Sequence, residues 1–154
     1  MWAPLEVIFR SKLPVLMRTH LETVFFHNPG QTRWLLEIRD VVEKYGVPEI
    51  REISAELTLV LRGQETAQTL FALSSQPPNL LEGVIIYGRF QYHEILILHI
   101  ALARGCLIAG LAGQERRGGV DFLGLVGAFV KVMKTIAGVK RVRFAYWDLA
   151  IPVV

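Results

Sequence analysis

Two strongly apolar segments constrain the fold of this chain more than any other feature of its sequence. They span residues 83–90 and 93–103, and a short turn near Gln91 and Tyr92 separates them. Apolar side chains occupy both alternating faces of each segment, a pattern typical of strands covered on both sides. We therefore expect two central strands of a sheet that carries packed elements on each face.

The N-terminal part of the chain predicts a short strand and two helices. Residues 5–9 have the β-branched and aromatic content of a strand, and residues 12–27 have helical apolar spacing, with Pro14 in the first turn. Residues 31–45 form the clearest amphipathic pattern, with apolar side chains on one helix face and charged ones on the other. Gly46 follows as a helix stop.

The period then changes from that of a helix to that of a strand. Residues 50–62 alternate between apolar and polar side chains, which predicts one half-exposed strand. Residues 62–65 predict a turn, and residues 66–75 predict a returning strand. A short helix over residues 64–73 is the alternative, because that segment contains fair helix formers. Residues 76–79 form a loop.

The C-terminal part predicts a helix followed by a strand. Residues 121–136 are apolar almost all round, Gly138 ends the helix, and residues 139–147 alternate as a strand. Residues 151–154 are expected to add an edge strand. A crossover through the helix makes the final long strand parallel to the one before it. We predict one α+β domain over residues 1–154, with a mixed, mainly antiparallel sheet, two N-terminal helices and one buried helix before the last strand.

A loop rich in glycine and arginine precedes the apolar helix. Arg116 and Arg117 supply two cations, and Gly118, Gly119 and Val120 bring backbone N–H groups to the start of the helix. Exposed N–H groups and the positive end of a helix dipole favour a bound anion. The segment therefore predicts a site for a phosphate or another small anion, and an exposed turn without a ligand is the alternative.

The order of elements, together with this loop, resembles the GNAT family of N-acetyltransferases. In that family a strand, a glycine-rich loop and a helix hold the pyrophosphate of acyl-coenzyme A. The resemblance implies that Arg116, Arg117, Gly118, Gly119 and Val120 would bind the pyrophosphate of acetyl-coenzyme A or another acyl-coenzyme A. It implies an acyl-coenzyme A-dependent N-acyltransferase.

Two residues on the predicted strands are candidates for the catalytic groups of such an enzyme. Glu94 lies beside an apolar strand face, where a carboxylate could deprotonate an amine, directly or through water. Tyr146 lies at the end of the last strand, where its phenol could protonate a leaving thiolate. The alternatives are a solvated carboxylate at the start of a strand and a half-buried structural aromatic ring.

A second function class fits the same sequence. Hydrophobic residues make up 52% of the chain, and no spacing indicates a complete catalytic constellation. This favours a non-catalytic α+β module that self-associates or binds a partner or a small ligand. The helix at residues 121–136 exposes more apolar surface than one sheet face can cover, so either the N-terminal helices or a second subunit must cover its back, and we expect a homodimer. The net charge is only +3, so nucleic acid is not an expected partner.

Metal binding and membrane insertion are not expected. His93 and His99 are about 20 Å apart on an extended strand, and His20 and His27 are about 10 Å apart on a helix, too far to share a metal. The single cysteine, Cys106, excludes an internal disulfide and suits a reducing compartment. We find no signal peptide and no uninterrupted apolar span, so we expect a cytoplasmic protein.

Overall fold

A computed structural model of the protein describes residues 6–103, 122–146 and 150–154. Its strands are β1 (Val7–Arg10), β2 (Leu13–Pro14), β3 (Pro48–Ile53), β4 (Glu56–Leu61), β5 (Gln68–Ser74), β6 (Leu81–Gln91), β7 (Glu94–Leu102), β8 (Arg141–Phe144) and β9 (Ala150–Pro152). Its helical segments are η1 (Val15–Met17), α1 (Arg18–Leu21), η2 (Glu22–Phe26), η3 (Pro29–Trp34), α2 (Leu35–Tyr45) and α4 (Phe122–Met133). The predicted α+β class is therefore confirmed.

The main sheet has six strands in the order β1-β5-β6-β7-β8-β9. Its neighbouring strands are antiparallel except for β7 and β8, which pair in parallel. The central position expected for β6 and β7 is confirmed, and so is the parallel strand that follows the apolar helix. The tail adds the edge strand β9, as the sequence predicted.

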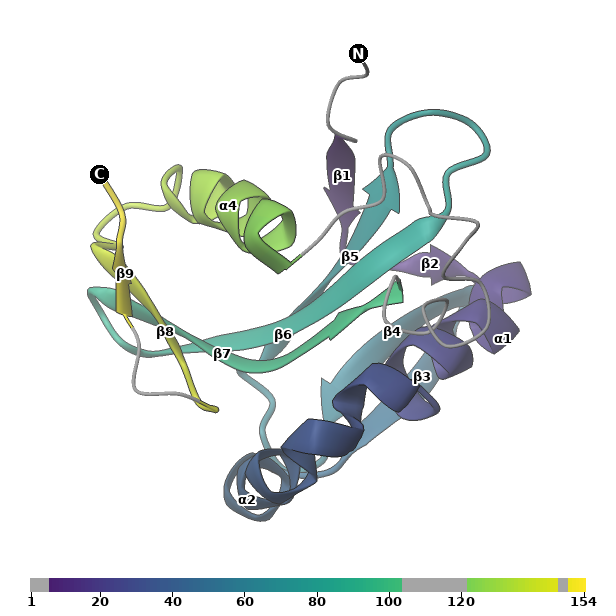
Figure 1. Ribbon diagram of the computed structural model, residues 1–154, viewed down its shortest axis with the longest axis horizontal. Coiled ribbons are helices and arrows are strands. Elements are labelled where there is room, and N and C mark those ends of the chain that lie inside the picture. The colour runs from purple at the N-terminus through teal and green to yellow at the C-terminus, as the bar shows by residue number, and fades with distance from the viewer. Residues whose placement is uncertain (1–5, 104–121, 147–149) are drawn as a thin grey trace.

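Helices cover opposite faces of this sheet. Figure 1 shows α4 on one side of the long strands β6 and β7, with α1 and α2 on the other side. Two separate hydrophobic clusters match these layers. One joins α1, α2 and β4 to the sheet through buried side chains that include Leu21, Val41 and Leu59. The other joins α4 to the sheet through Leu125 and Phe129.

The single strand predicted over residues 50–62 is wrong. The structure has a hairpin there, in which β3 and β4 pair antiparallel and Ser54 and Ala55 form the turn with φ of 53° and 63°. Two-residue hairpin turns of this kind need positive φ at both positions. With β2, this hairpin forms a second sheet in the order β2-β4-β3. Apolar and polar side chains continue to alternate through Ser54 and Ala55, so the sequence pattern shows no sign of the turn.

The helix predicted over residues 12–27 begins later than expected. Pro14 lies in β2, in extended conformation with ψ of 146°, and the helical backbone starts at Val15. The segment then passes from a 3₁₀ turn through α1 to the π-helical turn η2. The prediction for residues 31–45 is confirmed over α2, which ends at Gly46 with φ of 106°. No helix in the described part of the chain is long and apolar enough to cross a membrane.

Candidate functional site

A β-bulge in β7 changes the face of the sheet to which the side chain of His99 points. Ile86 pairs with His99 and Tyr87 pairs with Ile97, so Leu98 is the extra residue opposite this step. Such a bulge changes the phase of the side chains that follow it. Leu98 packs into the cluster that contains Phe25, and the ring of His99 lies 5.9 Å from the ring of Phe25. The bulge thus places a polar side chain on the same sheet face as the N-terminal helices.

The parallel ladder between β7 and β8 ends partway along β7. Its last pair is Ile97 with Phe144, followed by a hydrogen bond from Ala145 N to the carbonyl of Ile97. β7 continues to Leu102 without β8 beside it. The connection between η2 and η3 approaches that unpaired end, because the side-chain amide of Asn28 donates to the carbonyls of Val24 and Leu102 at 2.8 and 2.9 Å.

A small cavity of about 130 Å³ lies where the two strands separate. Its walls come from η3, α2, the end of β7, the first residue of α4 and Tyr146. The lining residues include Gln31, Trp34, Ile38, Ile100, Leu102 and Phe122. Most of these side chains are apolar, so the cavity suits a small apolar group with few polar atoms.

Tyr146 and His99 form a polar pair at this cavity. The hydroxyl of Tyr146 lies 3.0 Å from Nδ1 of His99, and the rings meet edge to face at 83°. His99 is only 3% exposed, and its Nε2 atom makes no hydrogen bond within the described residues. The pair therefore joins a buried imidazole to the half-buried phenol of a residue in the mostly apolar cavity wall.

Burial controls the protonation of both partners. Loss of solvation lowers the pKa of His99 from 6.5 to about 4, so the imidazole is neutral at pH 7. Loss of solvation, and then the negative charge of Glu37, raise the pKa of Tyr146 well above its usual value of 10.0. The phenol therefore keeps its proton at neutral pH and can donate it to a bound group.

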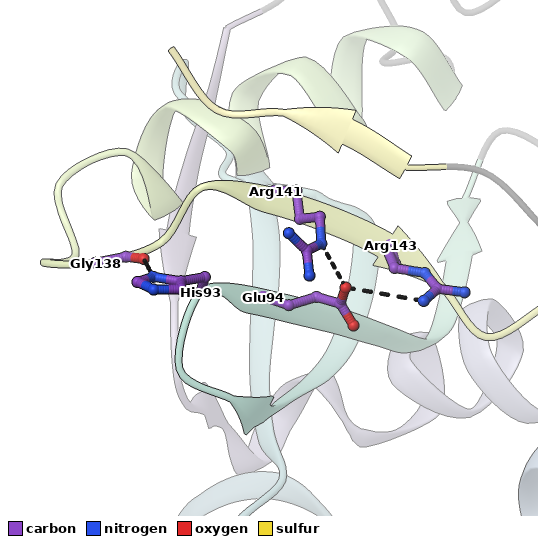
Figure 2. A network of polar contacts seen from close by, with 5 residues as sticks. All are labelled: His93, Glu94, Gly138, Arg141 and Arg143. Atoms are coloured by element: carbon purple, nitrogen blue, oxygen red, sulfur yellow. Dashed lines mark hydrogen bonds and ion pairs between the residues drawn. The ribbon is translucent and has the colours of Figure 1, made fainter.

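Glu94 lies at the first position of β7 and is only 7% exposed, so the alternative of a solvated carboxylate does not describe it. Its Oε2 atom accepts a hydrogen bond from Nε of Arg141 at 2.6 Å, and Nη1 of Arg143 lies 3.8 Å from the same oxygen. Figure 2 shows both contacts on one carboxylate oxygen, with the other oxygen turned away from the arginines. Nearby, His93 donates to the carbonyl of Gly138 at 2.9 Å.

A larger cavity of about 560 Å³ brings the two predicted catalytic residues together. Glu94 and Tyr146 both line it, although they come from different segments of the chain. Its remaining walls come from α2, the end of β6, β7 and β8, with Asp40, Lys44, Tyr45, Phe90, Leu96 and Arg143 among the lining residues. Tyr146 lines the small cavity as well. Tyr146 therefore borders both spaces.

The predicted anion-binding residues Arg116, Arg117, Gly118, Gly119 and Val120 lie outside the described residues. The helix they were expected to precede is described from Phe122 onward. Across residues 6–103, 122–146 and 150–154, no group of three or more His, Cys, Asp or Glu side chains has the geometry of a metal site.

Sequence reasoning missed the role of His99 and the polar contribution of Asn28. An unbroken period of two along the strand places His99 on the same face as His93, about 20 Å away and too far to share a metal, and indicates no other role for it. A histidine inside an otherwise apolar central strand was the available signal, because a buried imidazole usually has a hydrogen-bond partner. Its partner Tyr146 is 47 residues away in sequence, at no spacing that marks a motif.

Comparisons of the chain with protein-family models, with curated proteins and with solved structures gave no significant match.

Proposed function

We propose that the protein is an acyl-coenzyme A-dependent N-acyltransferase whose reaction takes place at Tyr146, between the two cavities. The small cavity would receive the acyl group and thioester of the donor. The larger cavity would receive the amine. The glycine and arginine residues at positions 116–119 would hold the pyrophosphate, and location in the cytoplasm would give access to acyl-coenzyme A.

The observation that carries this proposal is the shared position of Tyr146. Two substrates that exchange a group must meet, and one residue that lines two cavities marks a meeting point. The end of β7 adds support, because β8 does not pair with it beyond Ile97, and backbone groups outside a ladder can hydrogen-bond a ligand; the carbonyl of Leu102 already accepts from Asn28. Phe122, the first described residue of α4, lines the small cavity, and the segment proposed to hold the pyrophosphate directly precedes α4 in the sequence.

The chemistry follows from the side chains present. The amine nitrogen attacks the thioester carbonyl carbon, a C–N bond forms and the C–S bond breaks. The amine proton passes to the carboxylate of Glu94, directly or through water, and the phenol of Tyr146 gives its proton to the leaving sulfur. His99 touches neither substrate in this scheme, and positions the phenol through its hydrogen bond. After the product leaves, Glu94 releases the amine proton to solvent and Tyr146 regains a proton from solvent, so both groups return to their starting states.

Thermal unfolding with and without acetyl-coenzyme A tests the donor site. A ligand at 100 times its dissociation constant stabilises the folded state by about 2.7 kcal/mol, so millimolar acetyl-coenzyme A should raise the melting temperature. ATP at equal concentration is the control for a general effect of phosphate groups. An unchanged midpoint with acetyl-coenzyme A would refute the enzyme proposal.

The Tyr146→Phe variant tests the catalytic step separately from binding. It removes the donated proton and keeps the aromatic ring, so the stabilisation by acetyl-coenzyme A should remain. Release of free thiol in the presence of amines should fall by about a hundredfold, as expected for loss of a general acid. Equal thiol release by the variant and the natural protein would exclude Tyr146 as the acid.

A non-catalytic, self-associating module is the second candidate, and the outer face of α4 favours it. Leu123 is 78% exposed, and α1 and α2 lie on the opposite face of the sheet (Figure 1). A homodimer that buries this helix face would cover the exposed apolar surface. Sedimentation at micromolar concentration tests this, and a single species of 17.4 kDa would contradict it.

A further inference from the structure

The two arginines beside Glu94 lie at different distances from its carboxylate. One carboxylate faces two arginines, and the short contact of 2.6 Å belongs to Arg141. Arg143 lies 3.8 Å from the same oxygen, which is too long for a hydrogen bond. Arg141 alone satisfies the charge of Glu94, so the guanidinium of Arg143 is a surplus cation. Arg143, unlike Arg141, lines the larger cavity.

Arg143 is available to a ligand. Its side chain is 44% exposed, and the contact with Glu94 is its only ion pair within the described residues. A guanidinium carries five N–H donors in a planar fork, which matches a carboxylate better than any other common group. A cation of this type on a cavity wall favours a ligand with a planar oxyanion.

The opposite wall offers a second cation and an aromatic surface. Asp40 and Lys44 are four residues apart on α2 and share one helix face. Next to them, the rings of Tyr45 and Phe90 lie 5.3 Å apart with a tilt of 35°. These rings form an apolar platform that suits a flat apolar group.

We propose that the molecule bound in the larger cavity is an aromatic amino acid, recognised through its carboxylate by Arg143. Its ring packs on Tyr45 and Phe90, and its amine faces Glu94 and Tyr146. This inference rests on the proposed function, since it names the acceptor amine of that reaction. The cavity volume of about 560 Å³ suits a molecule of this size. Glu94 and Asp40 disfavour a phosphate dianion more than a carboxylate.

Binding of three matched probes, measured by calorimetry without coenzyme, tests the proposal. L-phenylalanine has the amine, the ring and the carboxylate. L-phenylalaninamide replaces the carboxylate with a neutral amide, and phenethylamine lacks it. We expect L-phenylalanine to bind about tenfold more tightly than either comparator, because only an ionised carboxylate can accept two parallel hydrogen bonds from the guanidinium and also neutralise its charge. In Arg143→Gln that preference should fall to about one.

Two further variants separate a specific role from a general loss of charge. Arg143→Lys keeps the charge without the planar fork, and should retain only part of the preference. Arg51→Gln removes an exposed arginine of β3 that is not among the cavity residues, and should leave the preference intact. Equal binding of the three probes, no binding of any of them, or an unchanged preference in Arg143→Gln would each overturn the proposal.

The same probes distinguish this inference from the proposed function. A preference for L-phenylalanine that depends on Arg143, without thiol release from acetyl-coenzyme A, would retain the ligand and reject the acyl transfer. Thiol release that is equal with phenethylamine and with L-phenylalanine would retain the acyl transfer and reject the carboxylate recognition.

Discussion

The hydroxyl of Tyr146 lies 3.0 Å from Nδ1 of His99, and Nε2 of the same imidazole makes no hydrogen bond within the described residues. If Nδ1 accepts from the phenol, Nε2 carries a buried N–H without an acceptor. If Nδ1 donates to the phenol, Nε2 is a buried acceptor, and the phenol keeps its own proton for another group. The second tautomer suits the acid role proposed for Tyr146.

Folding stability should depend on pH through His99. Its folded-state pKa of about 4 is below the ordinary 6.5, so the unfolded chain binds more protons between these values. Stability should therefore fall as the pH drops from about 6.5 to 4, by about 3 kcal/mol in total. Urea unfolding across this range measures the effect.

The variant His99→Gln should lose this part of the pH dependence, because glutamine does not titrate. Tyr146→Phe is the matched control. It removes the hydrogen-bond partner but leaves the imidazole buried, so the slope should remain. An unchanged slope in His99→Gln would show that other groups cause it.

Glu94 should be coupled more strongly to Arg141 than to Arg143. The first contact is a hydrogen bond of 2.6 Å to a buried carboxylate, and the second is a contact of 3.8 Å. Double-mutant cycles with Glu94→Gln, Arg141→Gln and Arg143→Gln should give about 1–2 kcal/mol for the first pair and below about 0.5 kcal/mol for the second. Equal coupling energies would remove the reason to treat Arg143 as a surplus cation.

The glycine-arginine loop should be required for anion binding and not for folding. Replacing Arg116 and Arg117 with alanine should weaken acetyl-coenzyme A by about 3 kcal/mol, because charge-assisted hydrogen bonds to phosphate are lost. The melting temperature without ligand should stay unchanged or rise slightly, since cations oppose the dipole at a helix start. Titration calorimetry measures the affinity.

Lys131→Ala/Lys134→Ala is the control for the loop variant. It removes two exposed cations at the C-terminal end of α4. The net charge therefore changes by the same amount as in the Arg116→Ala/Arg117→Ala variant. Equal affinities in the loop variant and the natural protein would leave the interaction module as the better proposal.

Gly46 should tolerate alanine far less than Gly63 does. Gly46 has φ of 106°, and a Cβ there would collide with the carbonyl oxygen of Arg62, so we expect Gly46→Ala to cost at least about 3 kcal/mol. Gly63 has φ of 84°, and no atom lies within 4 Å of the position that its Cβ would take, so only backbone strain of about 1 kcal/mol should remain. Denaturant unfolding of the two variants compares them, and similar losses would contradict this explanation.

The sequence predicted those parts of the fold that depend on local patterns. β6 and β7 are recognisable because apolar side chains fill both of their faces, and the parallel pairing of β8 follows from the handedness of a crossover through a helix. The hairpin at Ser54 and Ala55 was missed because neither residue is typical of a turn with two positive φ values. The hairpin of β3 and β4 becomes evident only from its pairing with β2 and its packing on the main sheet.

The candidate site was less predictable because it depends on contacts between distant residues. Glu94 and Tyr146 are candidates in the sequence because of their positions on strands, and nothing in the sequence indicates that they line one cavity. The bulge at Leu98 reverses the phase of β7, which no count of alternating residues reveals. In the sequence Arg143 is only one of three basic residues close together, with Lys140 and Arg141.

Pro152 restricts the ways in which copies of this chain can associate. Just after β9 the N–H of Val153 points inward to the carbonyl of Lys140, so by alternation the nitrogen of Pro152 points outward, along an edge of the sheet that no other described strand pairs with. Proline has no hydrogen on that nitrogen, and the outer row of donors is interrupted there. Addition of a further strand, and with it open-ended growth into fibrils, is therefore disfavoured at this edge.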